Sequence, residues 1–444
     1  MARPDPIAQA SSGPVGIIGA GIAGLTLALC LKKQGHDPVL FEMRGREALV
    51  TEGAFITLAP NAINALRMTG LADIVAESGL ITTGIELLDE RGRRLGYAEQ
   101  ADHPQAFGAP SVTIARGVLM EILATACEAC GVAIHYRTSP TDIDDLRDRV
   151  RVKTDDGRHH VFGWLAACDG LRSRTRRHAF PEAPRPKFTG LIGTGGIASA
   201  DDVASTGGTM RMVFGHCAFF GYLKQGNGPV YWFNSYPAQK PDAGHAPSFY
   251  VERLRLMHRA DAPVVDAILK HVPQIARDYP IFDMPPLPSW HRGRIVLLGD
   301  AAHAIGPHSG QGAAMAIEDA VALTACVGLE GNITQAFRRF EIMRRARVEE
   351  VARVTARNGG QKRASGWFGR LVRRVMLPLV LPVGIRAGRA LLTYRMDADP
   401  AVKSGLNGKA MTGRISRDAS AGVMQDINPR SVGSAAARWC PPPA

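Results

Sequence analysis

Three glycines near the start of the chain lie between a short apolar stretch and a run of helix-forming residues. The apolar stretch Val15–Ile18 predicts a strand, and Ile22–Lys33 predicts a helix. Between them, Gly19 permits a tight turn, Gly21 lets a ligand approach the backbone, and Gly24 allows the helix to pack closely on the strand. Such a turn presents the free N–H groups of a helix N-terminus to a diphosphate. The chain is therefore constrained to begin as the βαβ unit of a Rossmann-like fold that binds a dinucleotide.

An acidic residue follows where such folds bind the ribose of the adenosine half. Pro38–Glu42 predicts the second strand, and Glu42 ends it roughly 20 residues after the first glycine. A carboxylate at this place accepts hydrogen bonds from ribose hydroxyls. Because NAD and FAD both satisfy this pattern, later residues must distinguish between them.

Two later stretches favour FAD. A buried strand over 294–298 precedes Asp300, so this carboxylate lies at the carboxyl end of a strand, where ligands bind in open α/β sheets. There it accepts a hydrogen bond from a ribityl hydroxyl. The stretch from Gly310 to Gly312 then opens a helix over 312–326, whose N-terminus stabilises negative charge on a reduced isoalloxazine ring. The alternative, an Asp N-cap on an ordinary helix, does not require this surrounding pattern.

Composition excludes several other classes. Lys and Arg number 53 against 41 Asp and Glu, but the excess of +12 is widely spread and carries no nucleic-acid-binding signature, so we expect no nucleic acid partner. The 7 cysteines are irregularly spaced, and Cys127 and Cys130 form a CxxC without a second pair, so we expect small buried thiols and no metal site. Residues 1–12 carry no secretory signal and no run of about 20 apolar residues follows. The sequence therefore predicts a cytoplasmic protein.

Changes in residue composition and predicted secondary structure along the chain predict its domains. The expected fold class is α/β, in which a Rossmann-like FAD-binding domain is interrupted by a β-rich substrate domain and followed by a C-terminal helical segment. The expected division is a flexible lead over 1–12, an FAD-binding domain over 13–80, 105–185 and 286–360, a β-rich substrate domain over 81–104 and 186–285, a basic-apolar helical segment over 361–398, and a disordered tail over 399–444. Within the first domain, 160–167 predicts one continuous strand.

The basic-apolar segment leaves two interpretations open. Its prolines at 378 and 382 argue against a membrane-spanning helix. Residues 367–385 either contact a membrane surface weakly or cover the substrate domain with their apolar side, and we favour the second interpretation.

Over roughly residues 14–360 the chain resembles the class A FAD-dependent monooxygenases, which include para-hydroxybenzoate, salicylate and urate hydroxylases. The resemblance rests on motifs that occur in one order: the glycine turn at 19–24, Ala59-Pro60-Asn61-Ala62, Arg116-x-x-Leu119, Asp169-Gly170-x-Arg172-Ser173, Gly299-Asp300-Ala301-Ala302-His303, Pro307, Gly310-Gln311-Gly312 and Glu318-Asp319.

The resemblance implies roles for the residues that match these motifs. For FAD it implies Glu42 at the adenosine ribose, Arg44 at the flavin, Arg116 at the phosphate or ribityl region, Asp300 at the ribityl chain, and Gly312 with Ala313 at the flavin pyrimidine edge. Asp169 is associated with both FAD and NAD(P)H, and Arg172, Arg174 and Arg176 are candidates for the phosphates of the nicotinamide cofactor. NADH or NADPH would be a co-substrate without a domain of its own.

The implied reaction is oxygenation of a small hydrophobic molecule. Reduced flavin and O2 form a C4a-hydroperoxide, which hydroxylates or epoxidises an aromatic or polycyclic substrate of secondary metabolism or aromatic catabolism. We expect Pro307 and His308 at the flavin face, and Arg211 and Tyr222 in the substrate pocket. Phe214, Phe219 and Phe220 predict either a pocket wall or a core cluster, and His303 is expected to buttress the loop beside the flavin.

Other functions remain open at this point. A flavin halogenase lacks support because Trp232 is followed by Phe233 and Asn234 instead of the Trp-x-Trp-x-Ile-Pro signature, and a prenyl-lipid reductase lacks its aromatic motif. A non-catalytic flavoprotein helper that shields a biosynthetic intermediate is the alternative from another class. His308-Ser309 departs from the commoner Asn-Leu of the family, so the substrate cannot be transferred from the better-known hydroxylases. The oligomeric state is not predicted.

Overall fold

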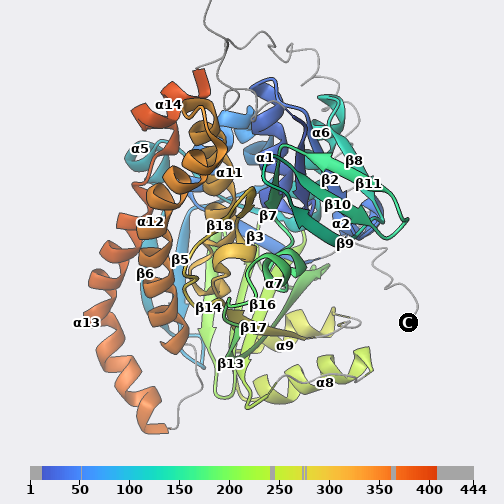
Figure 1. Ribbon diagram of the computed structural model, residues 1–444. Helices are drawn as coiled ribbons and strands as arrows, with labels where there is room; N and C mark the ends of the chain where they lie inside the picture. Colours follow the sequence, from blue (N-terminus) through green and yellow to red (C-terminus); the bar gives the residue numbers. More distant parts are fainter. Residues whose placement is uncertain are drawn as a thin grey trace, which may run out of the picture.

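A six-stranded sheet forms the centre of the first domain (Figure 1). The computed structural model describes residues 13–407 apart from residue 52 and segments 241–245, 273–274, 276–277 and 362–366. The strand order is β18-β19-β12-β1-β2-β8, and only β18 and β19 are antiparallel neighbours. These strands are β1 (Val15–Ile18), β2 (Pro38–Glu42), β8 (Ala133–Tyr136), β12 (Trp164–Ala167), β18 (His291–Arg292) and β19 (Ile295–Leu297).

The parallel arrangement brings three distant stretches of sequence to one edge of this sheet. Strands β1, β12 and β19 are adjacent and run in the same direction. Their carboxyl ends lead into Gly19, Asp169 and Asp300, respectively. The residues that the sequence assigned to one ligand therefore follow three neighbouring strands.

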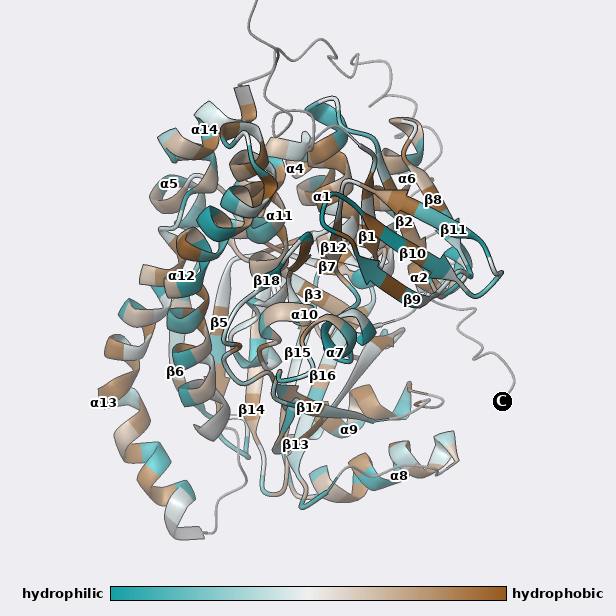
Figure 2. Ribbon diagram, viewed as in Figure 1, coloured by the Kyte–Doolittle hydropathy of each residue, from teal (hydrophilic) through white to brown (hydrophobic). Residues whose placement is uncertain are grey.

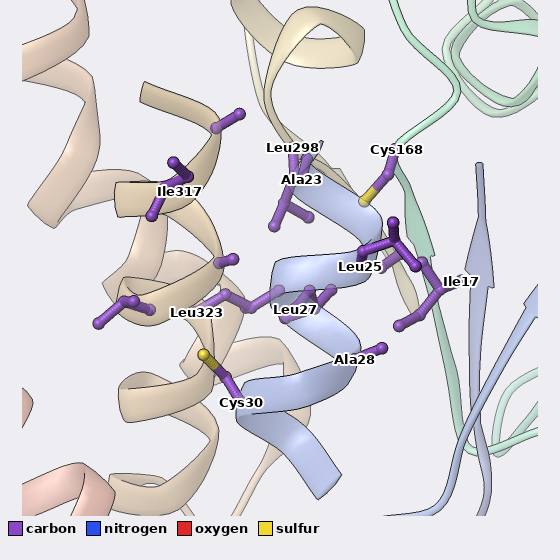
Figure 3. Packing of buried hydrophobic residues seen from close by; sticks show 14 of the residues in the cluster. Ile17, Ala23, Leu25, Leu27, Ala28, Cys30, Cys168, Leu298, Ile317 and Leu323 are labelled. Atoms are coloured by element: carbon purple, nitrogen blue, oxygen red, sulfur yellow. The ribbon is translucent and has the colours of Figure 1, made fainter. Parts of the chain in front are cut away.

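Helix α1 is buried on both sides. It spans Ile22–Lys33 and packs between the sheet and α11, which spans Gly312–Leu329. Figure 3 shows Leu25 of α1 beside Ile17 of β1, whereas Leu27 points toward α11. Because both sides are covered, α1 is apolar almost all round rather than amphipathic.

Two small antiparallel sheets complete the strands of this domain. They contain β3 (Phe55–Leu58), β4 (Leu80–Thr82) and β7 (Ser111–Ala115), and β9 (Pro140–Asp145), β10 (Val150–Thr154) and β11 (His159–Phe162). The single strand predicted over 160–167 is wrong. Gly163 separates β11 from β12, and these two strands belong to different sheets.

A seven-stranded sheet forms the β-rich part, with the order β17-β13-β16-β15-β14-β5-β6. Its strands are β5 (Gly84–Leu88), β6 (Arg94–Glu99), β13 (Lys187–Ala198), β14 (Thr209–Phe214), β15 (Phe219–Lys224), β16 (Val230–Pro237) and β17 (Tyr279–Asp283). Helices α8 (Pro247–His258) and α9 (Pro263–Lys270) supply apolar side chains to a core on one face of this sheet, around Tyr222 and Trp232. The strands all come from segments 81–104 and 186–285.

The remaining helices connect these sheets or cover them. They are α2 (Arg46–Thr51), α3 (Pro60–Leu66), α4 (Ala72–Glu77), α5 (His103–Phe107), α6 (Arg116–Ala129), α7 (Arg174–Ala179), α10 (Asp300–His303), α12 (Ile333–Gln361), α13 (Trp367–Leu392) and α14 (Pro400–Asn407), with short 3-10 turns at Arg67–Thr69, Pro307–Ser309 and Met396–Ala398.

Helix α13 lies along the outer side of the β-rich sheet (Figure 1) and contacts β6. Among the described residues, two helices are long and apolar enough to cross a membrane: Gly312–Leu329, of which 72% is buried, and Gly369–Leu392, of which 6% is buried. The sequence predicts no apolar run long enough to span a membrane, and by length and mean hydropathy these two helices contradict that prediction. The first run is the core helix α11, and the second remains at the surface, joined to the protein by ion pairs of Arg374 and Arg389.

The disordered tail was predicted to begin at residue 399, which is too early. Pro400–Asn407 forms helix α14, which packs against α11. The contact depends on two glycines, because a Cβ at Gly405 would lie 2.2 Å from the carbonyl oxygen of Ala325, and one at Gly328 would lie 2.1 Å from that of Gly405. The expected lead over 1–12 and the tail from 408 onward lie outside the described residues.

Replacement of Gly405 by alanine tests this close contact. The added methyl group would collide with backbone, which cannot rotate away, so we expect Gly405→Ala to destabilise the protein by about 1–3 kcal/mol in urea unfolding. Gly384→Ala on α13 is the control, because a Cβ there meets no atom within 4 Å. Equal stability of both variants would contradict close packing of α14 on α11.

Candidate active site

One continuous cavity of about 1740 Å³ joins the edge of the first sheet to the β-rich sheet. It is lined by the loops after β1, β12 and β19, by one face of the β-rich sheet, and by the inner side of α13. Single ligands of drug size usually occupy roughly 300–1,000 Å³. The cavity therefore has room for a dinucleotide together with a second molecule.

The glycine turn forms one end of the cavity, and each glycine has a separate steric reason. Gly19 has φ +98°, and a Cβ there would lie 2.5 Å from the carbonyl oxygen of Cys168. A Cβ at Gly24 would lie 2.0 Å from the carbonyl oxygen of Gly19, so no side chain fits between α1 and the turn. Gly21 differs, since a Cβ there meets no atom within 4 Å and the residue lines the cavity. This open space next to helical N–H groups fits a pyrophosphate.

Glu42 is held rigidly beside the turn. Its Oε2 accepts a hydrogen bond of 2.9 Å from the backbone N–H of Ala20, and its Oε1 accepts bonds from the backbone N–H and the Nε of Arg44, at 3.0 and 2.8 Å. The side chain is buried and lines the cavity. A carboxylate fixed in this way has lone pairs left for ribose hydroxyls.

Asp169 leaves one buried oxygen without a partner. Its Oδ2 accepts hydrogen bonds of 3.0 Å from both the backbone N–H and the hydroxyl of Thr175, whereas its Oδ1 is buried with no donor among the described residues. Such an atom is costly unless a ligand satisfies it. Because Asp169 lines the cavity, a hydroxyl of a bound cofactor fits this position.

Asp300 opens α10 at the end of β19, and its side chain is accessible from the cavity. The enclosing protein desolvates it and raises the pKa of Asp300, against the opposing charges of His303 and Arg116. A hydrogen-bond donor from a ligand would compensate a carboxylate in such surroundings. Across the cavity Gly312 begins α11 with open space at its Cα, so a flat ring can approach this helix N-terminus.

A buried ionic network fixes these loops from behind. Asp319 of α11 accepts hydrogen bonds from the backbone N–H of Gly299 at 3.0 Å, from His303 at 2.6 Å and from Arg344 at 2.8 Å. Burial alone would raise the pKa of Asp319, but the charges of His303 and Arg344 outweigh it and hold this pKa below its ordinary value. Arg344 also lies 2.7 Å from Glu318.

The same network reaches the loop before α11. The amide nitrogen of Asn61 donates hydrogen bonds to Glu318 at 2.7 Å and to Gln311 at 2.9 Å. His303 therefore has the buttressing position that the sequence suggested, since it is buried between Asp319 and Trp290. Pro307 and His308 line the cavity on the following turn.

The structure corrects the prediction that Arg211 on β14 and Tyr222 on β15 lie in the substrate pocket. Arg211 and Tyr222 are cross-strand neighbours, they do not line the cavity, and Tyr222 lies in the core beneath α8 and α9. Side chains alternate between the faces of a sheet, and these two have the wrong parity. The residues of the opposite parity form the wall of the cavity: Met210, Met212, Phe214, Phe219, Phe233 and Ser235. Phe220 stacks on Trp232 in the core, so only Phe214 and Phe219 belong to this wall.

The structure also corrects the prediction that Arg176 belongs to the nicotinamide-cofactor site. Arg176 is buried and donates hydrogen bonds to the carbonyl oxygens of Ala301 and Leu171, which makes it a structural residue. Arg172, Arg174 and Arg177 are exposed and line the cavity. The helical turn of α7 explains the exchange, because it directs residue 176 inward and residue 177 outward.

The chain matches the FAD binding domain family over residues 12–352. It is 31% identical to the aurachin C monooxygenase/isomerase of Stigmatella aurantiaca over 343 residues, which cover 77% of this chain and 88% of that protein. It is 31% identical to the 6-hydroxynicotinate 3-monooxygenase of Bordetella bronchiseptica over 356 residues, covering 78% and 91%.

A solved structure shares the fold. HpxO of Klebsiella pneumoniae, determined with FAD and uric acid, superposes with a TM-score of 0.76 at 23% identity and covers 86% of this chain and 97% of its own. The fold and the cavity define a flavoprotein that binds FAD. The chain belongs to the class A FAD-dependent monooxygenase family, as the motifs implied.

Two glycine variants separate cofactor binding from folding. In Gly21→Ala the added methyl group meets no protein atom but occupies the approach of the pyrophosphate, so we expect unchanged stability of the FAD-free protein and at least about tenfold weaker FAD binding. In Gly24→Ala the methyl group collides with the turn itself, so the FAD-free protein should lose stability. Thermal unfolding and flavin fluorescence titration measure the two effects. Equal FAD affinity of Gly21→Ala and the unaltered protein would exclude this turn as the pyrophosphate site.

Proposed function

We propose that this protein uses NAD(P)H and O2 to hydroxylate or epoxidise an uncharged hydrophobic aromatic or polycyclic molecule. One observation carries the proposal: the cavity that begins at the glycine turn continues, past Asp300 and Pro307, to an apolar wall on the β-rich sheet. A ligand that extends from the turn would present its far end to that wall. Reduced FAD supplies an electrophilic oxygen atom from O2 when it is bound at such a site.

The chain's own residues would shield and position the reactants. The methionines and phenylalanines of the wall keep water away from the reacting atoms, which prevents loss of the activated oxygen as peroxide. The network around Asp319 and Arg344 fixes the loops at 299–303 and 310–312 through hydrogen bonds and ion pairs, so they are already in position before the reaction. We assign no acid or base role to His303, because Asp319 and Trp290 already engage it.

The wall also supports an uncharged substrate. Among the described residues of the seven strands, Glu99 at the end of β6 is the only charged side chain that lines the cavity. A substrate carboxylate would therefore find no cation on this wall. Ser235 supplies one polar atom there: its hydroxyl is buried, unpartnered among the described residues, and on the same face as Phe233. A hydroxyl, carbonyl or ring nitrogen of the substrate would bond to it.

For the nicotinamide cofactor we propose Arg172, Arg174 and Arg177. They are exposed at the cavity next to Asp169, and three guanidinium groups suit the phosphates of a transient, anionic ligand. This assignment replaces Arg176 of the sequence prediction by Arg177.

Turnover with labelled oxygen tests the proposal. We expect the purified protein to be yellow, and a panel of phenolic, indolic and terpenoid compounds to contain at least one that stimulates NAD(P)H oxidation and gains one atom of ¹⁸O from ¹⁸O2. A flavoprotein helper predicts a different result, in which ligands bind tightly but flavin reduction stays slow with every compound. That result would overturn catalysis while leaving FAD binding intact.

Replacement of Ser235 tests the proposed orientation of the substrate. Removing one hydrogen bond to an uncharged partner costs about 0.5–1.5 kcal/mol, so Ser235→Ala should raise KM by roughly two- to tenfold, or release more peroxide per NAD(P)H oxidised. Tyr222→Phe is the control, since Tyr222 also lies on the β-rich sheet but on the face away from the cavity. A larger effect of Tyr222→Phe than of Ser235→Ala would place the substrate elsewhere.

A further inference from the structure

Helix α13 contains many apolar residues (Figure 2), and several of their side chains are exposed. Five of them form an outer stripe with helical spacing and exposed fractions between 41% and 68%: Leu371, Val372, Val375, Met376 and Leu379. A surface helix normally turns its apolar side toward the core and its polar side toward water. A contiguous apolar patch at the surface instead indicates an interaction site.

The opposite side of α13 is already occupied. Leu377 packs with Phe214 and Phe219 of the cavity wall, and Leu381 lies over Gly96 of β6, where a Cβ would be 2.1 Å away. Ion pairs fix the helix near both ends. Arg374 contacts Asp89 and Glu90 at 3.1 and 2.7 Å, and Arg389 contacts Asp102 at 2.7 Å. The outer stripe thus stays exposed while the inner side is committed to the protein.

The stripe continues into the opening of the cavity. Val380 and Val383 follow Leu379 on α13, are 45% and 60% exposed, and also line the cavity. An apolar path therefore runs from the outer stripe to the cavity interior along one helix. Such a path would let an apolar molecule pass from a lipid phase into the cavity without exposing its surface to water.

The charge of this surface selects the kind of partner. Segment 367–392 contains five arginines and no acidic residue. Arg374 and Arg389 are paired with acidic residues of the β-rich part, whereas Arg386 is exposed. The turn between β5 and β6, which the ion pairs of Arg374 join to α13, adds the exposed Arg91 and Arg93. An apolar stripe bordered by arginines is complementary to a bilayer that contains anionic lipids.

The same charge disfavours a second copy of the chain as the partner. A symmetric dimer would place the surface of α13 against the identical surface of its partner. Arginines would then face arginines, and like charges across an interface cost energy.

We propose that α13 docks this protein on an anionic membrane surface, with the outer stripe at the boundary between headgroups and acyl chains and the exposed Arg91, Arg93 and Arg386 at lipid phosphates. The cavity mouth at Val380 and Val383 would then face the bilayer. The class of substrate that fits is a hydrophobic ring compound that partitions into lipid. This statement about the substrate rests on the proposed function, whereas the docking surface does not.

Vesicle flotation of the full FAD-loaded chain tests the docking. The unaltered protein should float with vesicles of phosphatidylcholine and phosphatidylglycerol, more weakly with phosphatidylcholine alone, and less at high salt. Val375→Glu combined with Leu379→Glu should weaken binding by at least about tenfold, because two apolar side chains leave the lipid and two like charges enter it. Neither residue lines the cavity, so FAD content and thermal stability should not change.

A matched pair provides the control. Leu256→Glu combined with Ile342→Glu makes the same charge change at two exposed apolar residues of α8 and α12 and should leave flotation intact. Equal loss of binding in both pairs would overturn the proposal, as would an unaltered protein that never floats. A dimer of the unaltered protein by light scattering that Val375→Glu with Leu379→Glu converts to a monomer would overturn it in favour of self-association. Because flotation needs no turnover, its outcome is independent of the oxygenation test.

Discussion

The buried carboxylate pair Glu318 and Asp319, with Arg344 between them, is the interaction on which the active-site loops depend. All three side chains are fully removed from solvent. Burial would lower the pKa of Arg344, but the two carboxylates raise it, so the group stays charged. Removing one member of such a set strands the opposite charge and costs about 3–5 kcal/mol. Through Asp319 the network holds the Gly299 turn, and through Asn61 it holds Gln311. The loop at Gly299 and the loop at Gln311 thereby keep a fixed separation across the cavity.

Much of the first domain could be predicted because its causes are local. Strand β1, helix α1 and strand β2 have the bounds that the sequence suggested, since a glycine turn, helix formers and a short apolar run each act over a few residues. The three glycines could be explained one by one, because a missing Cβ is a property of a single position. Asp300 could be placed at the carboxyl end of its strand, whereas the adjacency of that strand to the strand before Asp169 is seen only in the structure.

The errors arose where a decision depends on contacts that the local sequence does not contain. The side of a strand that faces the cavity is set by its pairing, so Arg211 and Tyr222 were chosen with the wrong parity although their strands were located. Met212 and Phe233 would have followed from the alternation itself, had the core face been fixed by the apolar helices α8 and α9. Pro400–Asn407 was missed for a related reason, because Gly405 reads as flexible in sequence but serves as a contact surface for Ala325 of α11.

The two ends of the cavity differ in how many buried ionic and hydrogen-bonded contacts hold them in place. This difference fits separate roles for the two ends. Around the cofactor end, charged groups buried in pairs and backbone hydrogen bonds leave no freedom. At the substrate end, the wall consists of methionine and phenylalanine side chains under a single surface helix that a few ion pairs attach. Methionine adapts to irregular shapes, and a surface helix with few buried residues is less firmly held than the buried network at the other end. A rigid cofactor end suits a reaction that fails if water enters, whereas an adaptable, apolar wall suits the hydrophobic substrate that we propose.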